Sequence, residues 1–195
     1  TSNGYRAWLN RNEIDWRIIF NLLIGSVLAV LFLFFIAFNP SQILIIFSLG
    51  LLPFISQIMP KRLALDVTKP SVGFLAGIVV VSTNLIAGVG GPLLDVFFQR
   101  AEMTRHQVVA TKAVAQTVGH ISKIIFFGGL LTLSFKNWPD LYFLLIAIIL
   151  SLIGTTLGKK VLDNINDESF FLWTQNIILF IGAIFIIRGL SMLYF

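Results

Sequence analysis

The chain has no cysteine and little charge. Without cysteine, disulfides, thiolate catalysis and cysteine-ligated metal sites are excluded. Charged residues make up 12% of its 195 residues, about half of the roughly 25% found in soluble domains. These charges collect in short stretches between long apolar runs, as they do in chains surrounded by lipid. The composition therefore indicates an integral membrane protein.

Catalytic and metal-binding motifs are also missing. The two histidines, His106 and His120, lie fourteen residues apart and are not part of a His-Glu-x-x-His stretch. No serine lies in a nucleophile elbow. The glycine-rich stretch Gly88–Pro92 lacks the Gly-Lys-Ser/Thr ending of a phosphate loop. We therefore expect no enzyme activity, no metal and no cofactor.

The net charge of +5 would make nucleic acid a candidate partner for a soluble protein. Here the basic residues lie in short stretches beside apolar segments. They are better interpreted as determinants of membrane topology and as contacts to anionic lipids. We expect the chain to interact with the lipid bilayer and not with nucleic acid.

Six apolar segments follow one another along the chain. They cover residues 16–38, 41–59, 71–98, 107–133, 141–157 and 170–195. Crossing the hydrocarbon core takes about 20 helical residues. Barrel strands would alternate polar and apolar residues, and lipid leaves unpaired backbone groups without partners. The pattern predicts an all-α polytopic protein of the cell (inner or plasma) membrane, with Trp16, Trp138 and Trp173 as interfacial anchors.

Segment 71–98 is interrupted by Gly88-Val89-Gly90-Gly91-Pro92. Glycine and proline at this density disfavour a continuous helix. If the segment crosses once, the basic residues outside the membrane divide eight to four between the two sides. If it enters and returns as a re-entrant hairpin, they divide ten to two, in better agreement with the positive-inside bias. The ten are Arg6, Arg11, Arg17, Lys61, Arg62, Lys69, Arg100, Arg105, Lys159 and Lys160.

A hairpin followed by three crossings forms a unit whose second copy would be inverted in the membrane. Residues 71–195 fit one such unit, and residues 1–70 fit the last two crossings of another, with Asp15-Trp16 resembling Asn137-Trp138. The chain starts at Thr1 without methionine or signal peptide, so we expect that about fifty residues of a first copy precede it. Inverted repeats around a midplane site are typical of transporters.

Segment 107–133 carries an unusual polar face. At about 100° per residue, Lys112, Gln116, Gly119, His120 and Lys123 fall within a third of the helix circumference. Ten uncharged residues follow Lys123, which places it about 15 Å from the far end, near the bilayer centre. Ionisable groups at that depth need a cavity or a partner. Lys112 could equally snorkel to the interface, but the set as a whole favours a cavity for a small anion.

The break at Gly88, Gly90 and Gly91 could form the other half of such a site. Glycines let backbone amides approach a ligand, and a helix starting after Pro92 would direct its positive end toward an anion. A tight turn would explain the glycines equally well. Asn84 and Asp95 flank the break. Asp95 could pair with a lysine of the polar face, which we favour, or carry a coupled proton.

Two stretches carry a family resemblance. They are GFLAGIVVVSTNLIAGVGGPLLDVFF (73–98) and VVATKAVAQTVGHISKIIFFGG (108–129), and they resemble the TauE/SafE family of sulfite-exporter-like membrane proteins. In that family each half opens with a Gly-rich motif followed by an Ala-Thr motif. The second copy is present here as Gly88, Gly90, Gly91 and Pro92, then Ala110-Thr111-Lys112, whereas the first Gly-rich motif is missing. The resemblance implies a permease or exporter of small anions such as sulfite or organosulfonates.

We therefore hypothesise a transporter working by alternating access. Its predicted substrate-binding residues are Asn84, Gly88, Gly90, Gly91, Thr111, Lys112, Gln116 and Lys123, and its proton-coupling candidates are Asp95 and His120. The alternative is a membrane scaffold that uses the polar face for helix packing, with both lysines dry and paired. A cation or proton channel fits a positive face poorly. A homo-oligomer is compatible with the sequence.

Overall fold

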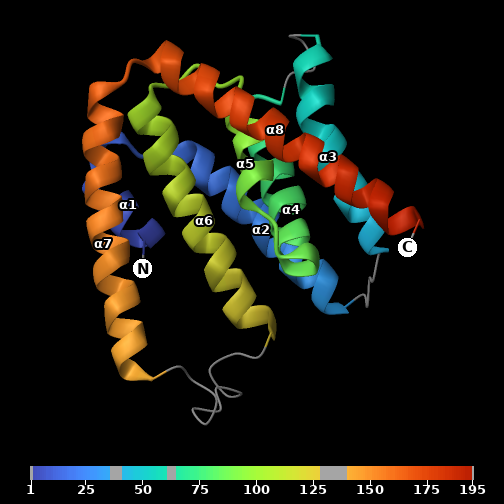
Figure 1. Ribbon diagram of the computed structural model, residues 1–195, viewed down its shortest axis with the longest axis horizontal. Helices are drawn as coiled ribbons and strands as arrows, with labels where there is room; N and C mark the ends of the chain where they lie inside the picture. The colour runs from blue at the N-terminus through green and yellow to red at the C-terminus, as the bar shows by residue number, and fades with distance from the viewer. Residues whose placement is uncertain (1, 36–40, 61–64, 128–139, 195) are drawn as a thin grey trace.

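The structure is a computed structural model that describes residues 2–35, 41–60, 65–127 and 140–194 (Figure 1). The described residues form helices joined by short connections, so the predicted all-α class is confirmed. The elements are α1 (Ser2–Leu9), a 3-10 turn η1 (Arg11–Glu13), α2 (Trp16–Phe35), α3 (Gln42–Ile58), α4 (Pro70–Ala87), α5 (Gly91–Phe98), α6 (Arg105–Phe127), α7 (Leu141–Asn164) and α8 (Asp167–Tyr194).

The helix boundaries follow the apolar segments closely. Four helices, α2, α4, α7 and α8, are long and apolar enough to cross a bilayer, and α3 is apolar but slightly shorter. Three differences stand out: α1 was not predicted, α7 continues past the apolar segment as far as Asn164, and α6, a predicted crossing, is not among the described helices that are apolar enough to cross. Residues 36–38, 128–133 and Trp138, which the predictions included, lie outside the described residues.

The predicted break divides segment 71–98 into α4 and α5. Gly88 adopts the left-handed conformation with φ 74°, which a residue with a Cβ atom rarely takes, and Pro92 sits in the first turn of α5, where no hydrogen bond is lost. The chain then reverses: the Val67 amide, just before α4, donates to the Phe97 carbonyl at the end of α5 at 3.1 Å. The two ends of the hairpin therefore meet. Its re-entrant position in the bilayer stays a prediction.

Helices α2 and α4 run parallel in direct backbone contact. Asn21 lies beside Gly73, and Gly77 beside Leu22, so both helices advance in the same direction. A Cβ atom added at Gly25 would lie 2.1 Å from the Phe74 carbonyl oxygen, and one at Gly77 would lie 2.1 Å from the Leu22 carbonyl oxygen. Only glycine at these two positions permits so close an approach.

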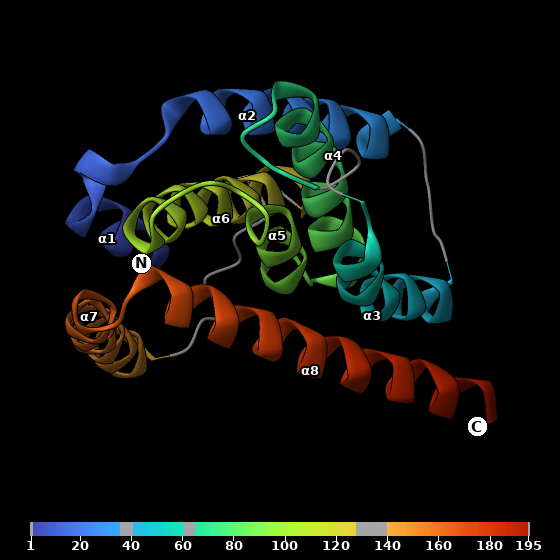
Figure 2. The ribbon, with the colours of Figure 1, turned by 90° about the horizontal axis from the view of Figure 1, so that it is seen from above.

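Helices α3 and α8 cross in opposite directions. A Cβ atom added at Gly182 would lie 2.9 Å from the Gly50 carbonyl oxygen. Further along, Gln175 Nε2 donates to Gln57 Oε1 at 2.7 Å. In Figure 2, α8 lies along the opposite edge of the molecule from α2, with α4, α5 and α6 between them.

The ends of several helices gather at one end of the molecule, here called the basic end (upper edge of Figure 1). Arg100 Nη2 donates to the Gln57 carbonyl at 2.9 Å, which joins the end of α5 to the end of α3. Arg105 donates to the Leu162 carbonyl at 2.8 Å and pairs with Asp167, also at 2.8 Å. These contacts bring the end of α7 and the starts of α6 and α8 to the same place.

The helix directions are compatible with an inverted repeat. Asp15 contacts Thr111 of α6, whereas Asn3, earlier in the chain, contacts His120, which is later in α6. The N-terminal region with α1 therefore runs antiparallel to α6. The division into a first repeat (1–70) and a second (71–195) remains our proposal.

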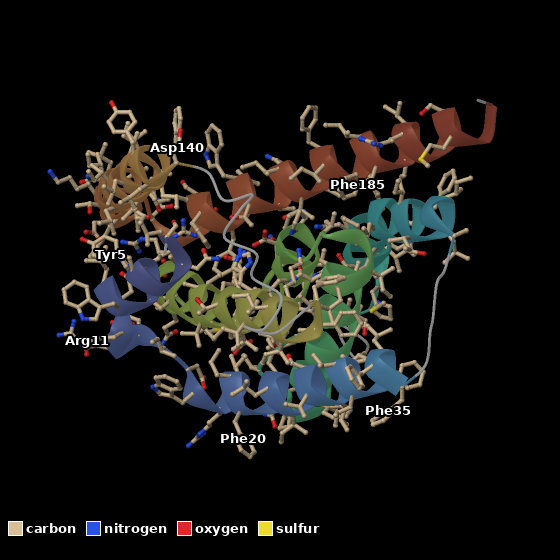
Figure 3. All side chains as sticks on the ribbon, turned by 90° about the horizontal axis from the view of Figure 1, so that it is seen from below. Tyr5, Arg11, Phe20, Phe35, Asp140 and Phe185 are labelled. Atoms are coloured by element: carbon tan, nitrogen blue, oxygen red, sulfur yellow. The ribbon has the colours of Figure 1, made fainter. Side chains whose placement is uncertain are left out.

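The outer surface is apolar over most of its height. Phe20 and Phe35 project from the outer face of α2 (Figure 3), with exposed fractions of 64% and 79%. On α7 and α8, Leu141, Phe143 and Phe180 are likewise exposed. A surface of this kind is stable only against lipid or another apolar partner, which makes the chain a multi-pass membrane protein.

Candidate functional site

A polar cavity of about 220 Å³ lies where the hairpin break meets α6. We call it the central cavity. It is lined by Asn3, Val80, Asn84, Gly88, Gly90, Gly91, Leu94, Ala115, Gln116, Gly119, His120 and Lys123. Six of the eight predicted substrate-binding residues are therefore brought together, although they come from three helices and the glycine-rich connection between α4 and α5.

Asn84 joins the break to α6. Its side chain is 9% exposed, and its Nδ2 donates to the Gly119 carbonyl at 3.3 Å. Cβ atoms added at Gly90 or Gly119 would each lie 3.1 Å from an Asn84 side-chain atom. Glycine at both positions thus lets the break, the amide and α6 come together. The Asn84 amide is fixed in orientation at the cavity wall.

The start of α5 forms a second wall. The first amides of a helix have no intrahelical partner and carry the positive end of its dipole. A Cβ atom at Gly91 would lie 3.5 Å from Gln116 Nε2, so the Gln116 amide faces this helix start. The cavity is therefore approached by backbone N–H groups from one side and a side-chain amide from the other.

Lys123 provides the positive charge of the cavity. Among the described residues, no carboxylate lines the cavity, so its formal charge is positive. Nor do three histidine or carboxylate side chains of the described chain gather closely enough to hold a metal ion. A site with one ammonium, amide donors and backbone N–H groups can bind a small anion.

His120 lies at the open edge of the cavity and contacts α1. Its Nε2 is 3.3 Å from Nδ2 of Asn3. Sequence reasoning missed Asn3, because a short polar stretch without a long apolar run gives no membrane-helix signal. The only sign of α1 was the pair Tyr5 and Trp8, three residues apart on one helix face.

Three predicted residues lie outside the central cavity. Lys112 forms an ion pair with Asp95 of α5, and both side chains are mostly buried, at 16% and 22% exposure. Thr111 is fully buried, and its Oγ1 accepts a hydrogen bond from the Asp15 amide at 3.0 Å. The pairing that we favoured for Asp95 is therefore present in this structure, whereas the direct roles of Thr111 and Lys112 in binding stay predictions.

Comparison with known proteins gives one result. No curated protein and no solved structure matches the chain. The profile of the family described as Sulfite exporter TauE/SafE matches residues 1–186, which include every helix around the central cavity. The match covers nearly the whole chain and agrees with the glycine-rich break followed by the polar face of α6. The chain belongs to the sulfite exporter TauE/SafE family.

Proposed function

We propose that the protein transports a small, sulfur-containing anion, such as sulfite or an organosulfonate, across the cell membrane through the central cavity. The observation that carries this proposal is the lining of the cavity: one ammonium, three side-chain amides, an imidazole and a helix start, with no carboxylate among the described lining residues. An oxyanion needs a compensating charge and several hydrogen-bond donors, and the cavity offers both. The substrate class comes from the family.

In the proposed binding mode, Lys123 Nζ offsets the charge of the substrate. Asn84 and Gln116 donate from their amides, and the backbone N–H groups at Gly90 and Gly91 donate from the helix start. Because Lys123 forms no ion pair with any described residue, the anion also lowers the cost of placing this charge near the bilayer centre. Alternating access would open the cavity to each side in turn as one repeat rocks against the other.

Asp95 and His120 are the proposed proton-coupling groups. Protonation of Asp95 would remove the partner of Lys112 and release the ammonium toward the substrate path. His120 lies at the edge of the cavity and could exchange a proton with water there. In this scheme Thr111 acts as a positioning residue, because it ties α6 to the start of α2.

Replacing Lys123 tests the binding mode. In proteoliposomes containing the full-length protein, Lys123→Met should reduce the flux of the transported anion at least about a hundredfold, because the buried charge of the substrate loses the ammonium that lines the described part of the cavity. Lys160→Met is the matched control, since Lys160 is exposed on α7 at the basic end and should transport normally. Sulfite, sulfate, thiosulfate and sulfonates form the test panel. Unchanged flux in Lys123→Met would overturn the role of this lysine.

The alternative of a membrane scaffold explains Lys112 but not Lys123. It requires both lysines to be dry and paired. Lys112 does pair with Asp95, whereas Lys123 lines a cavity of about 220 Å³. A cavity beside Lys123 is what a transporter needs and what a purely packed scaffold would lack, so it supports transport. A full-length protein that moves none of the test anions would favour the scaffold.

A further inference from the structure

A second polar cavity, also of about 220 Å³, lies between α1, α6 and α7. Its lining includes Arg6 and Asn10 of the N-terminal region, Val109 of α6, and Thr155 and Lys159 of α7. None of these residues belongs to the predicted site. Since a water molecule occupies about 30 Å³, the space would accommodate a small oxyanion together with several waters. We call it the basic-end cavity, because Lys159 lies beside the end of α7.

The charge of the basic-end cavity is positive. Lys159 Nζ lies 3.2 Å from both carboxylate oxygens of Asp163. The Oδ1 atom of Asp163 also lies 2.9 Å from His106 Nε2. Arg6 forms no ion pair with any residue that the structure describes. Lys159 is therefore largely compensated, whereas the Arg6 guanidinium faces the cavity with its charge and its donors available.

Glycine residues of α7 form an exposed side of this cavity. Gly154 and Gly158 line the cavity and are exposed, and Cβ atoms added at either would meet no atom within 4 Å. Their polar surroundings are fixed: Asn10 is 6% exposed and its Nδ2 donates to the Arg6 carbonyl at 3.0 Å, and Thr155 Oγ1 lies 3.0 Å from Ser2 Oγ. A space with a rigid polar wall, a positive charge and no filling side chain is suited to a ligand.

The two cavities lie in register along the same helix faces. On α6, Val109 lines the basic-end cavity and Gln116 lines the central one. In the N-terminal region, Asn10 lines the basic-end cavity and Asn3 lines the central one. Seven residues are about two helical turns, so each pair lies on one face about 10 Å apart. Lys112, one turn from Val109 and one turn from Gln116, lies between the two cavities with its partner Asp95.

We propose that the basic-end cavity is a second anion-binding subsite, which holds a small oxyanion on its way between the basic end and the central cavity. Arg6 is its charged ligand, and Lys159, shared with Asp163, provides a weaker second one. The transport role of this subsite rests on the proposed function, but anion binding to it does not. A stepwise path with two positive subsites separated by the Lys112–Asp95 pair would let the substrate leave one before it occupies the other.

The absence of cysteine permits a direct binding test. Gly158→Cys places a thiol in the open space of the cavity, and N-ethylmaleimide labels it in a chain whose 195 residues hold no other cysteine. Sulfate or methanesulfonate, neither of which consumes the reagent, should slow the labelling in a saturable way. Adding Arg6→Gln should raise the half-protecting concentration at least about tenfold, and Arg6→Lys should restore part of the protection. Adding Lys160→Gln is the control and should change nothing.

If Arg6→Gln does not fold, Lys159→Gln in the same background serves as the second variant and should weaken protection by a smaller factor. Labelling that no anion slows, or protection that is unaltered by both substitutions, overturns the subsite. Flux measurements separate this result from the proposed function. Protection without flux of any anion leaves the subsite in place and overturns transport, whereas flux without protection does the reverse.

Discussion

Gly88 sets the geometry of the site at the scale of a single residue. It is the one described residue with a clearly positive φ, and it opens the turn between α4 and α5. A side chain in this conformation costs about 1–2 kcal/mol. Gly88→Ala should therefore lower the unfolding temperature in detergent and reduce flux. Gly88→Asn should have a smaller effect, because asparagine tolerates the left-handed region. Equal behaviour of the two variants would show that the left-handed turn is not the constraint.

The Lys112–Asp95 pair gives a second prediction. Removing one partner leaves a mostly buried charge unpaired, so Lys112→Met or Asp95→Leu alone should destabilise the protein by about 3–5 kcal/mol. The double variant should recover most of the stability, because two apolar side chains can replace a buried pair. Thermal unfolding of all four proteins in one detergent gives the coupling free energy. Additive losses would mean that the two side chains do not depend on each other.

The sequence predicted the positions of the polar residues of α6 better than it predicted their partners. Periodicity alone placed Gln116, His120 and Lys123 on one face, and they do line one cavity. It also grouped Lys112 with them, because the spacing is right. The difference arises from α5: Asp95 approaches only the first of the two lysines. Whether Lys112 or Lys123 pairs with Asp95 depends on how α5 packs against α6, and the spacing of residues along α6 does not predict this packing.

At the scale of the helices, α2 and α4 make the closest backbone contact among the described helices. Gly77→Ala should force the two backbones apart and destabilise the protein by about 1–3 kcal/mol, as overpacking does. Gly4→Ala is the matched control, because a Cβ atom there meets nothing within 4 Å and should cause no loss of stability. Thermal unfolding in detergent measures both. A neutral Gly77→Ala would contradict the close approach.

The sequence predicted the ends of a helix where these ends coincide with the ends of an apolar segment. Apolar length predicted α2, α3 and α8 to within a few residues, because only a helix satisfies its backbone in hydrocarbon. The extension of α7 through Gly158 to Asn164 was missed, since it lies beyond the apolar stretch and is held by Arg105 donating to the Leu162 carbonyl. Polar helix ends depend on such contacts and not on hydropathy.

For the whole molecule, the hairpin makes a topological prediction. Single cysteines at Arg17, Glu102 and Lys160 should all react with a membrane-impermeant maleimide from one side, and a cysteine at Arg188 should react from the other. A segment 71–98 that crossed the bilayer fully would move Glu102 and Lys160 to the opposite side from Arg17. Labelling of right-side-out and inside-out vesicles distinguishes the two arrangements, and the cysteine-free chain supplies the background.

The backbone contacts of Gly25 and Gly77 have a mechanical consequence. Two helices separated by side chains can slide, because rotamers absorb small displacements. Helices α2 and α4 have carbonyl oxygens seated where those side chains would be, so a shift of even a fraction of a turn would produce a collision. The two helices must therefore move together as one rigid body, with Asn84 and the glycine break at its end. Any rearrangement that opens the protein has to be absorbed at softer joints, such as the hydroxyl contacts of Ser2 and Tyr5 with α7.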